Sequence, residues 1–186
     1  MTAVFIDGAY LEKVLRYDHG GARIHFGRLV AAMVQSDELL RAYYYHCLPY
    51  QSNPPTPEEK ERYAARHRFF TALRNIPRFE VRLGKLAFRG LDKDGDPMFQ
   101  QKRVDLMLGV DMALLAGKHR IAKVVLVSGD SDFTPAVEAV KNEGVLTTVW
   151  HGSLAREVRP SAELLQACDE RRELTTQVIR SVLLHS

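Results

Sequence analysis

The chain has 186 residues, of which 46% are hydrophobic and 26% are charged, and its formal net charge is +3. This length favours a single soluble domain, residues 1–186, with a substantial core. The two cysteines, Cys47 and Cys168, stand far apart, which argues against a zinc site or a disulfide framework. No apolar run approaches the ~20 residues that a membrane span needs, and the first residues lack the basic segment of a signal peptide. We expect a cytoplasmic protein without membrane contact, whose small positive charge permits a polyanionic partner.

The first part of the chain predicts two strands and two helices. Residues 3–6 are apolar and typical of a strand, and Asp7 follows them where apolar residues begin to recur at helical spacing. Asp7 is therefore expected at a strand-to-helix junction. A second helix is expected at about 27–33 and a second strand over 39–48.

A strong helix start opens the middle of the chain. Thr56, Pro57 and Glu59 have the residue types and spacing of a capping box with proline in the first turn, which predicts a helix to about Asn75. Its buried face is expected to hold Tyr63, His67, Phe70 and Leu73. Its cations, Lys60, Arg62, Arg66 and Arg68, point elsewhere, either into solvent or toward a phosphate.

Residues 79–88 alternate as a strand does, and a loop is expected over 90–97. The acidic run 92–96 has only a superficial likeness to a calcium loop. An EF-hand needs Gly at its sixth position and Glu at its twelfth, whereas here Gly95 is fourth and Arg103 is twelfth. We therefore predict a hairpin turn.

The next helix is expected from about 102 to 115 or 116, with Asp105 in its first turn, where the helix dipole favours a carboxylate. Asp111 follows six residues later, roughly 240° round the helix. The two acids cannot both point into one pocket without a bend, so Asp111 is expected to support or cap rather than to bind a ligand.

The stretch 124–135 carries the strongest signal. Four aliphatic residues form a strand that is expected to be buried on both faces, and Ser128-Gly129 ends it just before Asp130 and Asp132. Pro135 fits a first helical turn, with Asp132 or Thr134 as the N-cap. Both acids thus follow the carboxyl end of a parallel strand, where ligands bind in open α/β sheets.

The last part of the chain predicts a helix that ends at Gly144, a final strand over 145–150 and a helix capped by Ser161. An amphipathic helix over 173–184 is expected to pack on the body of the domain or to join two copies in a homodimer.

Alternating strands and helices predict an α/β fold, a three-layer α/β/α sandwich around a mostly parallel sheet. Right-handed crossovers then place Asp7 and Asp130 on one rim, with Asp132 a turn away and Asp105 within reach. Each pair of carboxylates at about 4 Å costs roughly 4 kcal/mol at an effective dielectric near 20, and a cation relieves this cost. Oxygen ligands favour Mg²⁺ or Mn²⁺, and such a site suits phosphodiester hydrolysis.

Several other chemistries lack their motifs. The sequence has no P-loop, no G-x-G-x-x-G, no G-x-S-x-G and no H-E-x-x-H, so no nucleotide cofactor is expected. An aspartyl phosphatase would have an acid two residues after Asp7, where Ala9 stands. A receiver-type domain with a phosphoacceptor aspartate stays open.

Three blocks, residues 5–11, 102–105 and 128–133, resemble the signature blocks of NYN domains in the PIN-like nuclease superfamily, with the LabA-like branch the nearest. Their order and spacing match over residues 2–170, which leaves 171–186 as a C-terminal helix. Ser-Gly-Asp-Ser-Asp-Phe after an apolar strand is the most specific block.

The resemblance implies a PIN-like sandwich and a metal-dependent ribonuclease. Asp7, Asp105 and Asp130 would hold Mg²⁺ or Mn²⁺, with Asp132 as a further ligand or as the group that orients water. Ser128 would support the loop, and Asp111 is a further family acid.

Tyr10 stands where many members have Asn, so it either weakens the metal site or stacks on a base. Lys102, Arg103 and Lys85 are expected to bind RNA phosphates, Arg103 because it stands where a small residue is common. The alternative is an RNA-binding or regulatory module that has lost turnover.

Overall fold

The computed structural model describes residues 1–91, 93 and 97–184, apart from the side chains of 87, 88, 91 and 97–102. The described strands form one sheet in the order β4-β3-β2-β1-β5-β6-β7, and every neighbouring pair is parallel except β3 and β4. The strands are β1 (Thr2–Asp7), β2 (Leu39–Cys47), β3 (Phe79–Leu91), β4 (Pro97–Lys102), β5 (Lys123–Val127), β6 (Leu146–His151) and β7 (Glu170–Glu173). The helices are α1 (Gly8–Tyr17), α2 (Phe26–Val34), α3 (Pro57–Arg74), α4 (Val104–Gly117), α5 (Thr134–Asn142), α6 (Ala162–Ala167) and α7 (Thr176–Ser181), with a 3₁₀ turn, η1 (Ser131–Phe133).

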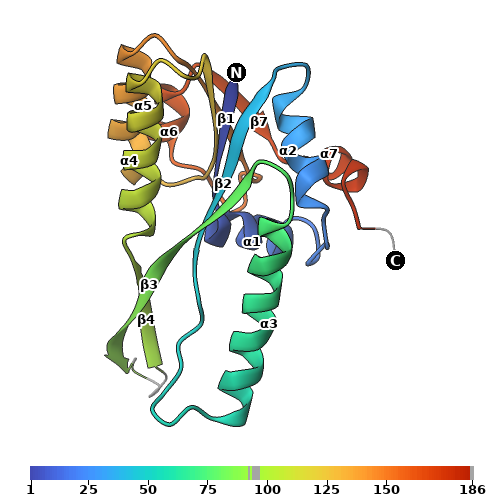
Figure 1. The fold of residues 1–186 in the computed structure, drawn as a ribbon, viewed down its shortest axis with the longest axis vertical. Coiled ribbons are helices and arrows are strands. Elements are labelled where there is room, and N and C mark those ends of the chain that lie inside the picture. The colour runs from blue at the N-terminus through green and yellow to red at the C-terminus, as the bar shows by residue number, and fades with distance from the viewer. Residues whose placement is uncertain (92, 94–96, 185–186) are drawn as a thin grey trace.

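Helices cover both faces of the sheet, as Figure 1 shows, and the predicted three-layer α/β/α sandwich is confirmed. Along β1, Val4 and Ile6 join a core shared with α1, α2, α3 and α7, whereas Ala3 and Phe5 join a core shared with α4, α5 and α6. This alternation follows from the two-residue period of a strand, and it explains why β1 and β5 read as uninterrupted apolar runs.

The central strands end side by side. Ile6 of β1 lies opposite Val127 of β5, and Asp7 lies opposite Tyr45 of β2. The prediction that the end of the first strand and the end at Val127 share one edge is confirmed. Asp7 is the last residue of β1, and Ser128 directly follows β5, so both residues lie at the same rim of the sheet.

A hairpin of β3 and β4 extends beyond the main sheet beside α3 (Figure 1). The alternation of residues predicted a strand only to 88, and β4 was not predicted. β4 is an edge strand that begins at proline, and its sequence lacks the apolar–polar alternation that identifies a half-buried strand. Residues 92 and 94–96 of the predicted turn lie outside the described part of the chain.

The C-terminal prediction was wrong in two respects. Residues 145–150 do not form the last strand, because β7 follows and pairs in parallel with β6. The final helix does not span 173–184, because Glu173 belongs to β7 and only α7 is helical. β7 was missed because its sequence, Glu-Arg-Arg-Glu, is wholly charged and its stability comes from backbone pairing.

The helix predicted from the capping box is α3, and both hydrogen bonds of the box between Thr56 and Glu59 form. Phe70 and Leu73 are buried as predicted, but His67 is exposed, and Arg66 turns inward to pair with Glu12 of α1. Of the helices described, none is at once long and apolar enough to cross a bilayer.

Candidate active site

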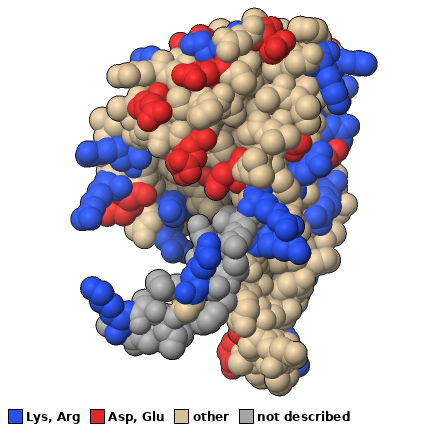
Figure 2. Space-filling view, turned by 90° about the vertical axis from the view of Figure 1, so that its left-hand side faces the viewer, with Lys and Arg blue, Asp and Glu red and all other residues tan. Residues whose placement is uncertain are grey.

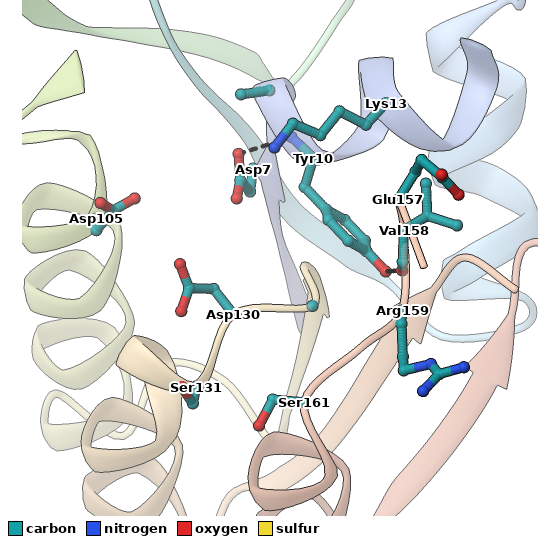
Figure 3. A pocket seen from close by; sticks show the side chains of 12 residues that line it. Asp7, Tyr10, Lys13, Asp105, Asp130, Ser131, Glu157, Val158, Arg159 and Ser161 are labelled. Atoms are coloured by element: carbon teal, nitrogen blue, oxygen red, sulfur yellow. Dashed lines mark hydrogen bonds between the residues drawn. The ribbon is translucent and has the colours of Figure 1, made fainter. Parts of the chain in front are cut away.

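A cavity of about 450 Å³ opens at the carboxyl ends of β1 and β5. Asp7 from the end of β1, Asp105 from the first turn of α4 and Asp130 from the loop after β5 all line it. Figure 3 shows their carboxylates around a common space. Three of the five acids that the sequence singled out are thus brought together by the fold.

Asp7 is held by hydrogen bonds from two directions. Its Oδ1 accepts from the backbone N–H of Tyr10 at 3.1 Å, which caps α1, and its Oδ2 accepts from the Ser128 hydroxyl at 3.4 Å. Burial and the negative charge of Asp105 outweigh these bonds and raise the pKa of Asp7 to about 6. The carboxylate is therefore fixed in direction and costly to ionise.

Asp130 shapes the loop that carries it. Its Oδ1 accepts from the backbone N–H of Asp132 at 3.0 Å and caps η1, while its own N–H donates to Ser128 Oγ at 3.2 Å. The predicted N-cap, Asp132 or Thr134, was wrong, because a 3₁₀ turn precedes α5 and Asp130 caps that turn instead. Ser128 is buried and connects this loop to Asp7.

Asp105 opens α4 after Arg103, whose φ of 74° places the backbone in the left-handed region. Burial raises the pKa of Asp105, and the charges of Asp130 and Asp132 raise it further. The loop after β5 therefore brings Asp130 and Asp132 close enough to disfavour the ionised form of Asp105.

The other two acids lie outside the cavity. Asp132 lines a neighbouring apolar groove between α4 and α5, together with Asp105. Asp111 accepts a hydrogen bond from the Tyr45 hydroxyl at 2.8 Å and lies 3.7 Å from Arg82 Nε. The divergence of Asp105 and Asp111 follows the predicted angle round the helix.

Tyr10 is engaged by protein groups. Its hydroxyl donates to the Val158 carbonyl at 2.8 Å and accepts from the Gly152 N–H at 2.9 Å. Its ring lies so close to Gly129 that a Cβ there would be 2.6 Å from Tyr10 Cε2. Tyr10 therefore joins α1 to the loop after β6 through its hydroxyl, and its side chain also lines the cavity.

Two cations that line the cavity were missed by the sequence analysis, namely Lys13 of α1 and Arg159 of the loop between β6 and α6. Lys13 follows Tyr10 by three residues and so lies on the same face of the helix. This spacing could have predicted that Lys13 lies near the site. The loop after β6 leaves the same edge of the sheet, so Arg159 could also have been anticipated. Figure 2 shows acidic side chains beside a hollow with basic side chains around them.

The cations that the sequence did single out lie elsewhere. Lys85 on β3 and Arg103 before α4 are exposed, and neither lines the cavity. Lys102 pairs with Lys85 across the hairpin, and its side chain lies outside the described part of the chain.

A second polar cluster flanks Asp7 on the side of β2. His46 is buried at the end of this strand, with Nε2 3.4 Å from Glu12 Oε2, and Glu12 also pairs with Arg66 of α3. Burial raises the pKa of Glu12, but His46 and Arg66 outweigh it and lower that pKa to about 2. This cluster ties α1 to β2 and α3 and thereby holds the Asp7 junction in place.

The donor chemistry of the cavity suits a hard divalent cation, because its acidic groups present only oxygen. Among the residues that the structure describes, however, no three His, Cys, Asp or Glu side chains are arranged to hold one ion. Mg²⁺ is commonly held by one or two carboxylates together with water and substrate phosphate. The residues present fit that mode, and they do not form an all-protein cage.

Comparison with known proteins supports the architecture. The model of the NYN domain family matches residues 1–175. The crystal structure of VPA0982, a Vibrio parahaemolyticus protein of unknown function, aligns with a TM-score of 0.67 over 98% of this chain and 95% of that one, at 22% identity. At this identity the likeness shows the fold alone. No curated protein matches the sequence.

Proposed function

The chain belongs to the NYN domain family of the PIN-like nuclease superfamily, and we propose that it is a divalent-metal-dependent endoribonuclease that acts on RNA in the cytoplasm. The observation that carries the proposal is the convergence of Asp7, Asp105 and Asp130 on one open cavity. The three sequence blocks favour the LabA-like branch.

Asp7, Asp105 and Asp130 would share the binding of Mg²⁺ or Mn²⁺, with water and substrate phosphate completing the ligands of each ion. When bound, such an ion polarises a phosphoryl oxygen and lowers the pKa of water toward neutrality. Burial disfavours the ionised forms of Asp7 and Asp105. The charge of Asp105 adds to this effect at Asp7, and the charges of Asp130 and Asp132 add to it at Asp105. A cation bound among these carboxylates would relieve the repulsion and so would bind more tightly. Asp132 adds negative charge at the same rim.

The other residues of the cavity position the acids and the substrate. Ser128 contacts both Asp7 and the Asp130 loop, and Tyr10 supplies the backbone N–H that directs the Asp7 carboxylate. Lys13 and Arg159 provide positive charge for the phosphates on either side of the scissile bond. Lys85, Lys102 and Arg103 would contact RNA farther along the hairpin.

A second candidate is an RNA-binding or regulatory module without turnover. The absence of a three-residue metal group among the described residues favours it, as does Tyr10 in place of the Asn that many members carry.

Cleavage assays on mixed single-stranded and structured RNAs with Mn²⁺ would separate the two candidates. We expect the parent protein to cleave, Asp105→Asn and Asp130→Asn to lose at least about 100-fold in rate, and Glu138→Gln to retain activity. Glu138 is an exposed acid on α5 that does not line the cavity. RNA binding without cleavage by the parent, and equally by both Asn variants, would favour the regulatory module.

A further inference from the structure

The outer face of α4 is apolar and exposed. Leu106, Val110 and Leu114 are 70%, 46% and 54% exposed, and their four-residue spacing aligns them as one ridge, which we call the α4 stripe. The opposite face of the helix is buried in the core through Val104, Leu108, Met112 and Ala116. A contiguous ridge of exposed apolar side chains is typical of a surface that another protein covers.

A groove of about 380 Å³ runs beside the stripe, between α4 and α5. Small side chains form its floor, among them Ala113 of α4 and Ala136 and Ala139 of α5. At Gly109 an added Cβ would lie 3.4 Å from the Ala136 Cβ, which is an ordinary van der Waals contact, so the two helices pack closely at this point. Ridge and groove therefore lie next to each other on one face, which is the shape that a self-complementary contact requires.

The two ends of α4 carry opposite charge. Lys118, His119 and Arg120 follow its C-terminus, and all three are exposed. In the part of the chain that the structure describes, none of them forms an ion pair. At the other end, the carboxylates of Asp130 and Asp132 lie close enough to Asp105 to raise its pKa, so negative charge gathers at the start of the helix. α4 has 14 residues and is about 21 Å long, so the two ends are well separated.

We propose that the α4 face binds a second copy of this chain in an antiparallel, two-fold symmetric dimer. The α4 stripe of each copy fills the groove of the other, and the basic end of one helix lies against the acidic end of its mate. A parallel arrangement would set acid against acid and is disfavoured. The antiparallel one places Lys118 and Arg120 of the second copy next to Asp105, and hence at the edge of the acidic cavity.

Figure 2 is consistent with this surface. It shows the side of the molecule where α4 and α5 lie in Figure 1, with an area of few charged side chains adjoining the acidic group.

Sedimentation velocity across a range of protein concentrations tests the proposal without any RNA or metal. We expect a reversible dimer, and we expect Leu106→Glu with Leu114→Glu to raise its Kd by at least about 30-fold, because two charges replace the buried ridge. Leu154→Glu is the matched control, since Leu154 is 65% exposed in the loop after β6 and lies outside the α4 face. Circular dichroism would establish that each variant is folded.

Charge reversal at the C-terminal end of α4 measures how much the ionic contacts contribute to dimer affinity. Lys118→Glu with Arg120→Glu should raise the Kd about 10-fold at low ionic strength, and the effect should shrink as salt screens the pairs. A parent protein that stays monomeric at every concentration would overturn the proposal. So would a dimer whose Kd is unchanged by the stripe variants, or one that charge reversal strengthens.

Discussion

Asp7 and Asp105 lie far apart in the sequence but face one cavity, and the charge of Asp105 helps to raise the pKa of Asp7 to about 6. Burial is the larger cause of this shift. The fold thus maintains a carboxylate in a position where its ionised form is unfavourable. Such an arrangement lowers stability and is typical of a site that binds a cation.

Replacing Asp7 by Asn should stabilise the metal-free protein at neutral pH. The folded-state pKa of Asp7 is raised from 3.8 to about 6, so the folded protein loses stability relative to the unfolded chain as pH rises through this interval. The loss is complete above about pH 6 and amounts to at most about 3 kcal/mol. Asn keeps the cap of α1 and cannot ionise.

Urea unfolding in EDTA at pH 4, 6 and 8 would measure this effect. The variant should have the higher free energy of unfolding. Its difference from the parent should be small at pH 4 and should grow to a plateau between pH 6 and pH 8. A difference that is constant across this range would contradict the raised pKa.

Mn²⁺ should stabilise the parent protein against heating. At 100 times its Kd, an ion that binds only the folded state contributes about 2.7 kcal/mol. Asp105→Asn should lose most of this gain, whereas Asp111→Asn should keep it, because Asp111 lies on the same helix but contacts Tyr45 instead of the cavity. Thermal melts of each variant with and without Mn²⁺ provide the comparison, and equal shifts in all three proteins would argue against the site.

Tyr10→Phe should reduce stability by about 1–3 kcal/mol, because the change leaves the buried Gly152 N–H without its acceptor. The backbone N–H of residue 10 would still donate to Asp7. Chemical denaturation should therefore show a lower midpoint, while calorimetry should show unchanged Mn²⁺ binding. Loss of metal binding at full stability would mean that the hydroxyl acts on the metal site itself.

Two glycine-to-alanine changes should have opposite effects. At Gly8 a Cβ would be 2.5 Å from Tyr44 Cζ, and the Tyr44 ring is fully buried, so Gly8→Ala should cost about 1–3 kcal/mol. At Gly117, the last residue of α4, no atom lies within 4 Å of such a Cβ. Gly117→Ala should be neutral or stabilising by up to about 1 kcal/mol. The denaturant midpoints of Gly8→Ala and Gly117→Ala would be compared with that of the parent. A lower midpoint for Gly8→Ala alone would show that the close Tyr44 ring requires glycine at position 8.

Lys13 and Arg159 should contribute to RNA affinity. Lys13→Ala and Arg159→Ala should each weaken binding of a single-stranded RNA and reduce the slope of log K against log salt by about 1. Arg180→Ala, an exposed change on α7, is the control. Fluorescence anisotropy at several salt concentrations would measure the slopes, and unchanged slopes for both cavity variants would place the phosphate contacts elsewhere.

Much of the fold could be predicted because its signals are local. The apolar runs of β1 and β5 predicted buried parallel strands, and the capping box predicted the start of α3 within a residue. β4 and β7 could not be predicted in this way. Both lie at the edges of the sheet, and neither alternates between apolar and polar residues, so backbone pairing with a neighbour determines their conformation.

Residue types and spacing were sufficient to predict an α/β sandwich, to place Asp7 and Asp130 on one rim and to separate Asp111 from Asp105. Only the tertiary structure decided that Tyr10 is tied to the loop after β6 and that the α4 stripe faces solvent. The physical reason is that strand and helix periods are properties of neighbouring residues, whereas burial, pKa and the filling of a cavity depend on segments that meet only when the chain has folded.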